Sequence, residues 1–275
     1  MRGWWQDLSD LVLPAECAGC GRSRTTLCER CSAALRGAVP SRVRPWPAPP
    51  GMPVVFGAVP YRNAVRAVLL AHKERGALGL ARPLGEALAG AVRSVLAEGG
   101  DEWGGAGGRA AGGAVGPVTL VPVPSAPRAV RARGHDPTRR IAYAAAAELR
   151  RAGVAARVLA VLRQRRAVAD QSGLDARQRL VNVTGALEVV GGGSGLLTGN
   201  GRIVLVDDLI TTGASLAEAA RAIAVATGYV KIEREGGSER GRAGAGRGKV
   251  GEIDGIMFRA AVVAASPDSF EINRN

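Results

Sequence analysis

Two adjacent carboxylates that directly follow an apolar run are the residues with the clearest capacity for chemistry. Residues 203–206 are all aliphatic, and Asp207 and Asp208 come next. A small turn rich in hydroxyl groups then opens a segment with helical spacing, and its members are Thr211, Thr212, Gly213, Ala214 and Ser215. Carboxylates at the end of a buried strand can accept from paired ribose hydroxyls, while the turn can surround a phosphate at the positive helix end. The pattern therefore predicts a sugar-phosphate site, and the alternative is an ordinary helix N-cap.

The four cysteines form a second candidate site near the N-terminus. They are arranged as two Cys-x2-Cys pairs, Cys17 with Cys20 and Cys28 with Cys31. Two such pairs can hold opposite sides of a tetrahedral ion, and four thiolates suit zinc at about 2.3 Å per bond. Because four protein ligands leave no position for water, the predicted zinc is structural. The alternatives are a redox pair, two disulfides or an iron–sulfur cluster.

Apolar runs and helical spacing predict the elements that must position these groups. The predicted strands are 54–59, 118–121, 157–162, 203–206 and 259–265. The predicted helices are 64–76, 81–97, 139–151 and 215–226. Strands that alternate with helices indicate an α/β fold, and continuous apolar runs suit parallel strands that are covered on both faces. We therefore expect a mostly parallel sheet flanked by helices.

Proline and glycine mark the expected domain organisation. The cysteines fall in a predicted module at 1–45, followed by a proline-rich linker at 46–53 and a main domain at 54–275. The whole stretch from Pro40 to Pro53 is expected to lack regular structure. Glycine-rich inserts are expected to loop out near 99–116, 191–201 and 229–252.

Composition narrows the class of partner. The net charge is +13, carried almost entirely by arginine, which favours phosphorylated metabolites, nucleic acid or both. The 47% hydrophobic content is enough for a core and argues against a disordered chain. No run approaches the roughly 18 uncharged apolar residues of a spanning helix, and Asp7 and Asp10 stand where a signal peptide would be apolar. We expect no membrane insertion and a cytoplasmic location.

Residues 203–215 resemble the phosphoribosyl pyrophosphate (PRPP) motif of type I phosphoribosyltransferases: four aliphatic residues, two acidic residues and a Thr-Thr-Gly loop. The chain as a whole resembles the ComF/GntX family of competence-associated proteins, in which a four-cysteine module precedes such a domain. This resemblance rests on Cys17–Cys31, Tyr61–Arg75, and the runs VPVPSAPRAVRARGHDP and QSGLDARQRLVNVTGAL. It implies a type I phosphoribosyltransferase-like fold with a small zinc-ribbon-like module.

The resemblance also implies roles for particular residues. Asp207 and Asp208 would be the active-site carboxylates that hold the ribose, and 211–215 would hold the phosphate. In that fold the turn after the first strand contacts pyrophosphate, and here the resemblance places it after the predicted strand 118–121, with Pro122, Val123, Pro124, Ser125, Arg128, Arg131 and Arg133 as candidates. The run 163–182 resembles a lid that closes over PRPP, with Gln171, Arg177, Arg179 and Asn182 as candidate contacts. For each arginine, the alternative is a solvated basic face.

The implied reaction is displacement of pyrophosphate from C1 of the ribose by an unidentified acceptor, with Mg2+ bridging pyrophosphate and ribose. The alternative is a non-catalytic nucleic-acid-binding or DNA-uptake assembly protein that keeps the PRPP fold, beside a helicase-like competence partner. Because only 4% of residues are aromatic, binding of single-stranded DNA is expected to be weak and non-specific. The expected DNA site is the cysteine module, which Trp4, Trp5 and Trp46 flank, together with Arg42 and Arg44.

Overall fold

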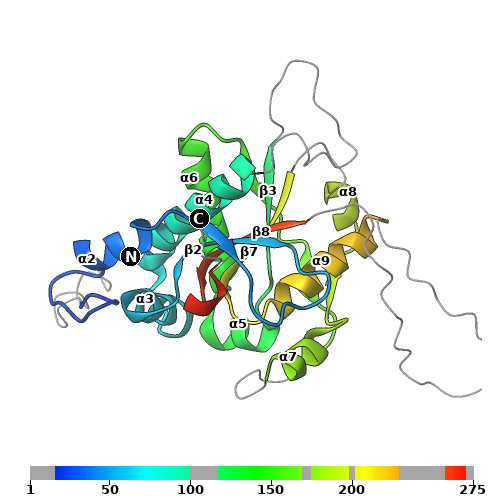
Figure 1. Ribbon diagram of the computed structural model, residues 1–275, viewed down its shortest axis with the longest axis horizontal. Coiled ribbons are helices and arrows are strands. Elements are labelled where there is room, and N and C mark those ends of the chain that lie inside the picture. Colours follow the sequence, from blue (N-terminus) through cyan, green and yellow to red (C-terminus); the bar gives the residue numbers. More distant parts are fainter. Residues whose placement is uncertain (1–15, 99–116, 169–174, 198–201, 229–257, 271–275) are drawn as a thin grey trace, which may run out of the picture.

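The computed structural model describes residues 16–98, 117–168, 175–197, 202–228 and 258–270. A six-stranded sheet with the order β1-β2-β8-β7-β3-β4 forms its centre (Figure 1). The strands are β1 (Ser41–Val43), β2 (Val54–Pro60), β3 (Val118–Pro122), β4 (Ala156–Val158), β7 (Arg202–Ile210) and β8 (Arg259–Ala265). The edge strand β1 is antiparallel to β2, and every other neighbouring pair is parallel. The predicted α/β class with a mostly parallel sheet is confirmed.

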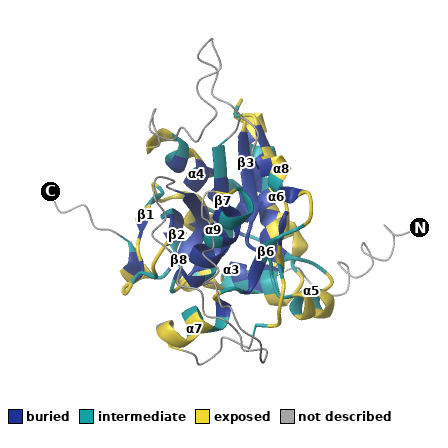
Figure 2. Ribbon diagram, turned by 90° about the vertical axis from the view of Figure 1, so that its right-hand side faces the viewer, coloured by how far each residue is buried: buried dark blue, intermediate teal, exposed yellow. Residues whose placement is uncertain are grey.

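Helices cover both faces of this sheet. One face carries α3 (Asn63–Glu74), α4 (Ala81–Glu98) and α6 (Pro137–Arg151), and the other carries α9 (Ala214–Ala226). The remaining elements are α2 (Glu29–Arg36), η1 (Leu78–Leu80), α5 (Pro127–Arg133), β5 (Leu162–Gln164), α7 (Ala176–Val183), β6 (Leu187–Val189), α8 (Gly193–Leu197) and η2 (Pro267–Ser269). Strands β5 and β6 form a separate antiparallel pair. Figure 2 shows burial concentrated in the sheet and its facing helices, with α7 largely exposed.

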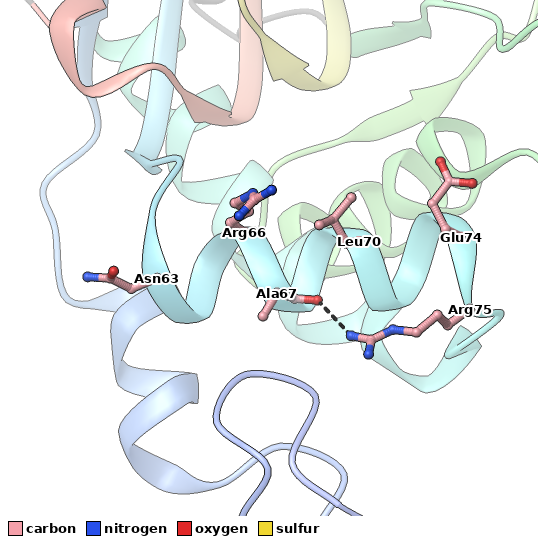
Figure 3. A pocket seen from close by; sticks show the side chains of 6 residues that line it. All are labelled: Asn63, Arg66, Ala67, Leu70, Glu74 and Arg75. Carbon is pink, nitrogen blue, oxygen red and sulfur yellow. Dashed lines mark hydrogen bonds between the residues drawn. The ribbon is translucent and has the colours of Figure 1, made fainter. Parts of the chain in front are cut away.

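Helix α3 crosses the carboxyl edge of the sheet. It begins at Asn63, just after β2 ends at Pro60, and its last turn reaches β7, where Lys73 contacts Asp208. The side of α3 that faces away from the core borders a hollow of about 540 Å³ (Figure 3). A helix in this position forms one wall of any site at the strand ends.

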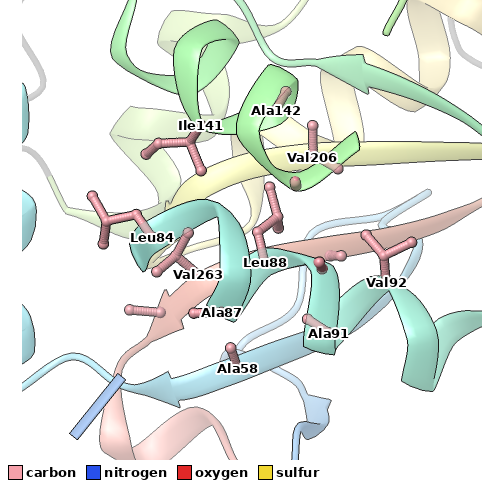
Figure 4. Close-up of a cluster of buried hydrophobic side chains, with 14 of the residues drawn as sticks. Ala58, Leu84, Ala87, Leu88, Ala91, Val92, Ile141, Ala142, Val206 and Val263 are labelled. Carbon is pink, nitrogen blue, oxygen red and sulfur yellow. The ribbon is translucent and has the colours of Figure 1, made fainter. Parts of the chain in front are cut away.

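Alternation along β7 divides the core into two clusters. Val206 packs with Leu84 and Leu88 of α4, Ile141 of α6 and Val263 of β8 (Figure 4). The residues that precede Val206 and Val263 on the two strands, Leu205 and Val262, belong instead to the cluster that packs against α9. Because successive side chains of a strand point to opposite faces, an uninterrupted aliphatic run serves both clusters at once.

Three segments differ from the sequence-based expectation. Within Pro40 to Pro53, Ser41–Val43 form β1, because these three residues include no proline and Val43 is buried against the sheet. The predicted strand 157–162 is divided between β4 in the main sheet and β5 in the separate pair. The predicted glycine-rich turn 191–201 contains α8, whose Leu197 is buried. The predicted inserts at 99–116 and 229–252 lie outside the described residues.

The cysteine-bearing segment is joined to the main sheet. Leu35 of α2 is 1% exposed and belongs to the α3–α4 side of the core. Strand β1 pairs with β2, and the Arg44 amide donates to the carbonyl of Ser269 at 2.6 Å. The domain division at residue 45 stays a prediction, but residues on both sides of it share one core.

Within the described segments, no helix is both long and apolar enough to span a membrane.

Candidate functional site

Asp208, one of the two adjacent acidic residues of β7, forms an ion pair with Lys73 of α3. Asp208 is 4% exposed, and its Oδ2 accepts from Nζ of Lys73, at the end of α3, at 2.8 Å. The charge of Asp208 raises the pKa of Lys73, so the ammonium form persists. Sequence reasoning missed Lys73, although a signal existed: it is one of only three lysines in a chain whose positive charge is otherwise arginine.

Asp207 has a different environment. Its Oδ1 accepts from the Asp208 amide at 2.8 Å and from the Thr138 hydroxyl at 3.4 Å. Although part of its surface is exposed, burial raises the pKa of Asp207, and the charge of Asp208 raises it further against the opposing effect of Lys73. Two carboxylates therefore share one ammonium, which leaves accepting capacity for hydroxyl groups or a cation.

The predicted phosphate turn directly precedes α9. Gly213 is the N-cap residue with a φ of 77°, and no side chain caps this end of the helix. Thr211 is exposed, whereas Thr212 and Ser215 are partly buried. An uncapped N-terminus of a 13-residue helix beside three hydroxyls is suited to an anion. The structure thus brings the predicted turn and the acidic pair together at the end of β7.

The proline-rich segment lies against this turn, which the sequence did not indicate. A Cβ on Gly213 would stand 2.5 Å from the Met52 sulfur and 3.4 Å from Cγ of Pro45. Glycine is therefore required at 213 both for the positive φ and for the close approach of Met52.

The predicted pyrophosphate turn lies beside β7. Val123 follows β3 and its amide donates to the Val206 carbonyl at 2.9 Å. The amide and hydroxyl of Ser125 donate to the Asp136 carboxylate at 3.3 and 3.4 Å. Asp136 also caps α6, because its side chain accepts from the Arg139 amide. This chain of contacts holds the turn at the same edge of the sheet as Asp207.

Of the three arginines of α5 that are candidate pyrophosphate contacts, one forms an ion pair and two are exposed. Arg133 donates two hydrogen bonds to Glu74 of α3, at 2.9 and 2.7 Å. Arg128 and Arg131 are exposed on α5, and among the described residues no contact ties them to the acidic pair. The bidentate Arg133–Glu74 pair places α5 next to the end of α3.

The two histidines lie where α5 meets the end of α3. His72 is fully buried and its pKa is lowered, chiefly by burial. The ring nitrogens of His135 lie 3.2 Å from the carbonyl oxygens of Arg133 and His72. These backbone contacts of His135 connect the end of α5 to the end of α3.

The predicted lid residues fall on α7 or outside the described residues. Arg177, Arg179 and Asn182 lie on α7, which begins with a capping box between Asp175 and Gln178 and packs against α9. Gln171 lies outside the described residues. Helix α7 therefore adjoins the helix that starts at the phosphate turn, and a lid role stays a prediction.

The four cysteine sulfurs gather as a possible metal site. They lie within 4.8 Å of one another, with Cys20 exposed and the other three buried. Burial opposes the thiolate, but amide donors from Cys28, Gly19 and Cys20 outweigh it and lower the pKa of Cys17 to about 6. Burial raises the pKa of Cys31 to about 12. A bound cation would allow all four to ionise together.

The cysteine cluster is seated against α3. A Cβ on Gly19 would stand 2.7 Å from the Cys31 sulfur and 3.3 Å from the Ala64 side chain. Glycine at position 19 therefore permits the approach of both the cluster and α3. The pKa of the exposed Arg30 guanidinium is raised, chiefly by a hydrogen bond with Cys20. The positive charge of Arg30 therefore offsets negative charge on the cysteine sulfurs.

A scan against protein-family models and a search of curated proteins find no match for this chain. The ComF/GntX resemblance therefore stays an expectation.

Proposed function

We propose that this chain binds PRPP at the carboxyl edge of its sheet and transfers the phosphoribosyl group to an acceptor, as a type I phosphoribosyltransferase-like protein. The observation that carries the proposal is the junction of β7 and α9. There, the Asp207–Asp208 pair is followed within one turn by an uncapped helix N-terminus that carries Thr211, Thr212 and Ser215. A diol and a phosphate separated by one sugar ring need this combination of acceptors and donors.

Each part of the substrate has a matching group. Asp207 and Asp208 accept from the ribose hydroxyls, with Lys73 limiting the repulsion between the two carboxylates. The amides of Gly213 and Ala214 and the neighbouring hydroxyls donate to the 5-phosphate. The turn at Pro124 and Ser125, with Arg128, faces the pyrophosphate. No nucleophilic side chain is required, because the acceptor attacks the sugar directly.

The donor set also fits a magnesium ion carried in by the substrate. Carboxylate oxygens suit Mg2+, which is usually held by one or two carboxylates together with substrate phosphates. When bound, Mg2+ would neutralise charge on the leaving pyrophosphate. As the bond from the acceptor to C1 forms, the C1–oxygen bond breaks, its electron pair leaves with pyrophosphate, and the proton of the acceptor passes to solvent.

For the cysteines, we propose a structural zinc. Four sulfurs from two Cys-x2-Cys pairs, gathered within 4.8 Å, match closed tetrahedral coordination. Elemental analysis of purified protein should give about one zinc per chain, and a folded, reduced protein without metal would refute this part of the proposal.

Binding and turnover are tested separately. Calorimetry with PRPP, with and without Mg2+, is expected to show one site per chain that binds more tightly when Mg2+ is present. A pyrophosphate-release screen over free bases then identifies turnover. Binding without release for any acceptor would favour the alternative, a competence or DNA-uptake assembly protein that retains the fold. Absence of PRPP binding would refute the proposal.

A further inference from the structure

The hollow on α3 has a defined chemical character. Its described lining consists of residues of α3 and the C-cap residue that follows it: Asn63, Arg66, Ala67, Leu70, Glu74 and Arg75 (Figure 3). Arg75 is fixed by a hydrogen bond from Nη2 to the Ala67 carbonyl at 3.3 Å. Glu74 is neutralised by the two hydrogen bonds from Arg133. The lining therefore keeps an excess of positive charge beside the small apolar surface of Ala67 and Leu70.

Helical spacing joins this hollow to the acidic pair. Arg66, Leu70 and Lys73 stand at positions i, i+4 and i+7, which lie along one side of a helix. Figure 3 shows Arg66, Leu70 and Glu74 directed to the same side of α3. Lys73 ends this row at Asp208, with a distance of 2.8 Å between its Nζ and Oδ2. Leu70 of the lining is thus about one helical turn before Lys73, the residue that contacts Asp208.

The two ends of the hollow differ in their relation to the pyrophosphate turn, because the Glu74 end meets α5 through Arg133 and the Arg66 end does not. That turn follows β3, on one side of β7, whereas α3 starts after β2, on the other side. Arg66 lies in the first half of α3, toward β2. When an incoming group displaces a leaving group at a sugar carbon, the two groups can lie on opposite faces of the sugar ring. We therefore expect the acceptor on the side of β7 away from the pyrophosphate turn.

We propose that the hollow on α3 is the acceptor site and that it takes an anionic planar ring, with Arg66 pairing with the anionic group and Leu70 contacting the ring. This inference rests on the proposed function, since it takes the ribose position from that proposal. Among the described residues Arg66 has no carboxylate partner, so its guanidinium is available.

The test compares rings that carry a carboxylate with related neutral rings. Orotate and uracil, and nicotinate and nicotinamide, are titrated calorimetrically into the full chain, both alone and with saturating ribose 5-phosphate, which cannot react. We expect each anionic ring to bind about tenfold or more tightly than its neutral partner, as a charge-assisted hydrogen bond implies. Arg66→Gln should abolish this preference without changing the affinity for uracil or nicotinamide. Arg93→Gln, an exposed arginine of α4 outside the lining, is the matched control.

The outcomes separate the inference from the function on which it rests. Equal affinity for both members of each pair, or a preference that survives Arg66→Gln, would overturn the inference even if ribose 5-phosphate binds. A preference lost in both arginine variants would reflect overall charge and would also overturn it. If Arg66→Gln instead weakens PRPP binding, the hollow serves PRPP and not the acceptor. Failure of ribose 5-phosphate to bind would refute the proposed function, while the titrations without it still measure the preference.

Discussion

Asp207, Asp208 and Lys73 determine the charge of the candidate site. Asp208 and Lys73 are 135 residues apart in the chain and 2.8 Å apart in space. Their contact neutralises the buried member of the acidic pair, while Asp207 keeps a raised pKa because of its burial and its charged neighbour. This cost in folding is consistent with residues retained for binding.

The pKa of Asp207 gives a stability prediction. Its folded-state pKa lies above the ordinary value of 3.8, so the native state holds a proton that the unfolded state has lost. Stability must therefore fall as the pH rises from 3.8 through the folded-state pKa. Asp207→Asn, whose amide oxygen can still accept from Thr138, should become increasingly stable relative to wild type as the pH rises above 3.8. Urea unfolding measures the difference, with exposed Asp268→Asn as the control.

Lys73 should stabilise the fold through the same group of charges. Breaking a buried pair costs about 3 to 5 kcal/mol. Since 34% of the Lys73 side chain is exposed, solvent offsets part of this, and we expect Lys73→Met to cost about 1 to 3 kcal/mol. Because its pKa is raised, the contribution is present below about pH 10.5 and is lost as the pH rises through the folded-state pKa. Lys73→Arg should retain most of it. Denaturation at pH 7 showing no cost for Lys73→Met would contradict this role.

At the scale of elements, the segment from Pro45 to Met52 supports the phosphate turn. Gly213→Ala would place a methyl group in the left-handed region, at about 1 to 2 kcal/mol, and 2.5 Å from the Met52 sulfur. Gly153 has a φ of 81° and nothing within 4 Å of its Cβ position. Gly213→Ala should therefore cost about 1 to 3 kcal/mol more than Gly153→Ala, and Met52→Ala should recover part of the excess. Equal costs in thermal unfolding would exclude a supporting contact.

The cysteine segment should depend on one glycine in a similar way. Gly19→Ala places its Cβ 2.7 Å from the Cys31 sulfur, so the sulfur must move from the cluster. We expect zinc affinity to fall about tenfold or more, as for other changes that misplace metal ligands. Competition with a chromophoric chelator measures it, and Gly79→Ala, with nothing within 4 Å, is the control. Unchanged affinity for zinc would show that the cluster tolerates the shift.

Sequence patterns predicted the elements with long apolar runs more successfully than those defined by distant contacts. The aliphatic run before Asp207 marked β7, and the helical spacing up to His72 marked α3. By contrast, β1 is defined by the antiparallel pairing of Ser41–Val43 with β2, a contact between separate segments. The same limit applies to the site: the acidic pair and its turn are contiguous in sequence, whereas Lys73 and Met52 reach them only through the fold.

At the scale of the whole molecule, the position of α3 across the sheet indicates the class of ligand more specifically than the net charge does. The charge of +13 agrees with anionic ligands of several kinds. Trp46 is 92% exposed and Arg44 is exposed beside it, so the predicted weak contact with single-stranded DNA has a surface at hand. That contact would lie on the segment that also touches Gly213, so the proposed sites for nucleic acid and PRPP would adjoin each other.

The central claim is that the acidic pair of β7 holds the ribose of PRPP, and the affinity of Asp207→Asn for PRPP tests it most directly. Calorimetry in the presence of Mg2+ compares the wild type with this variant, in which one carboxylate oxygen is replaced by an NH2 group. The account predicts that the variant stays folded and that its PRPP binding weakens by about 1.5 to 3 kcal/mol, the value of a hydrogen bond to a charged group. An unchanged PRPP affinity in a folded Asp207→Asn variant would contradict it.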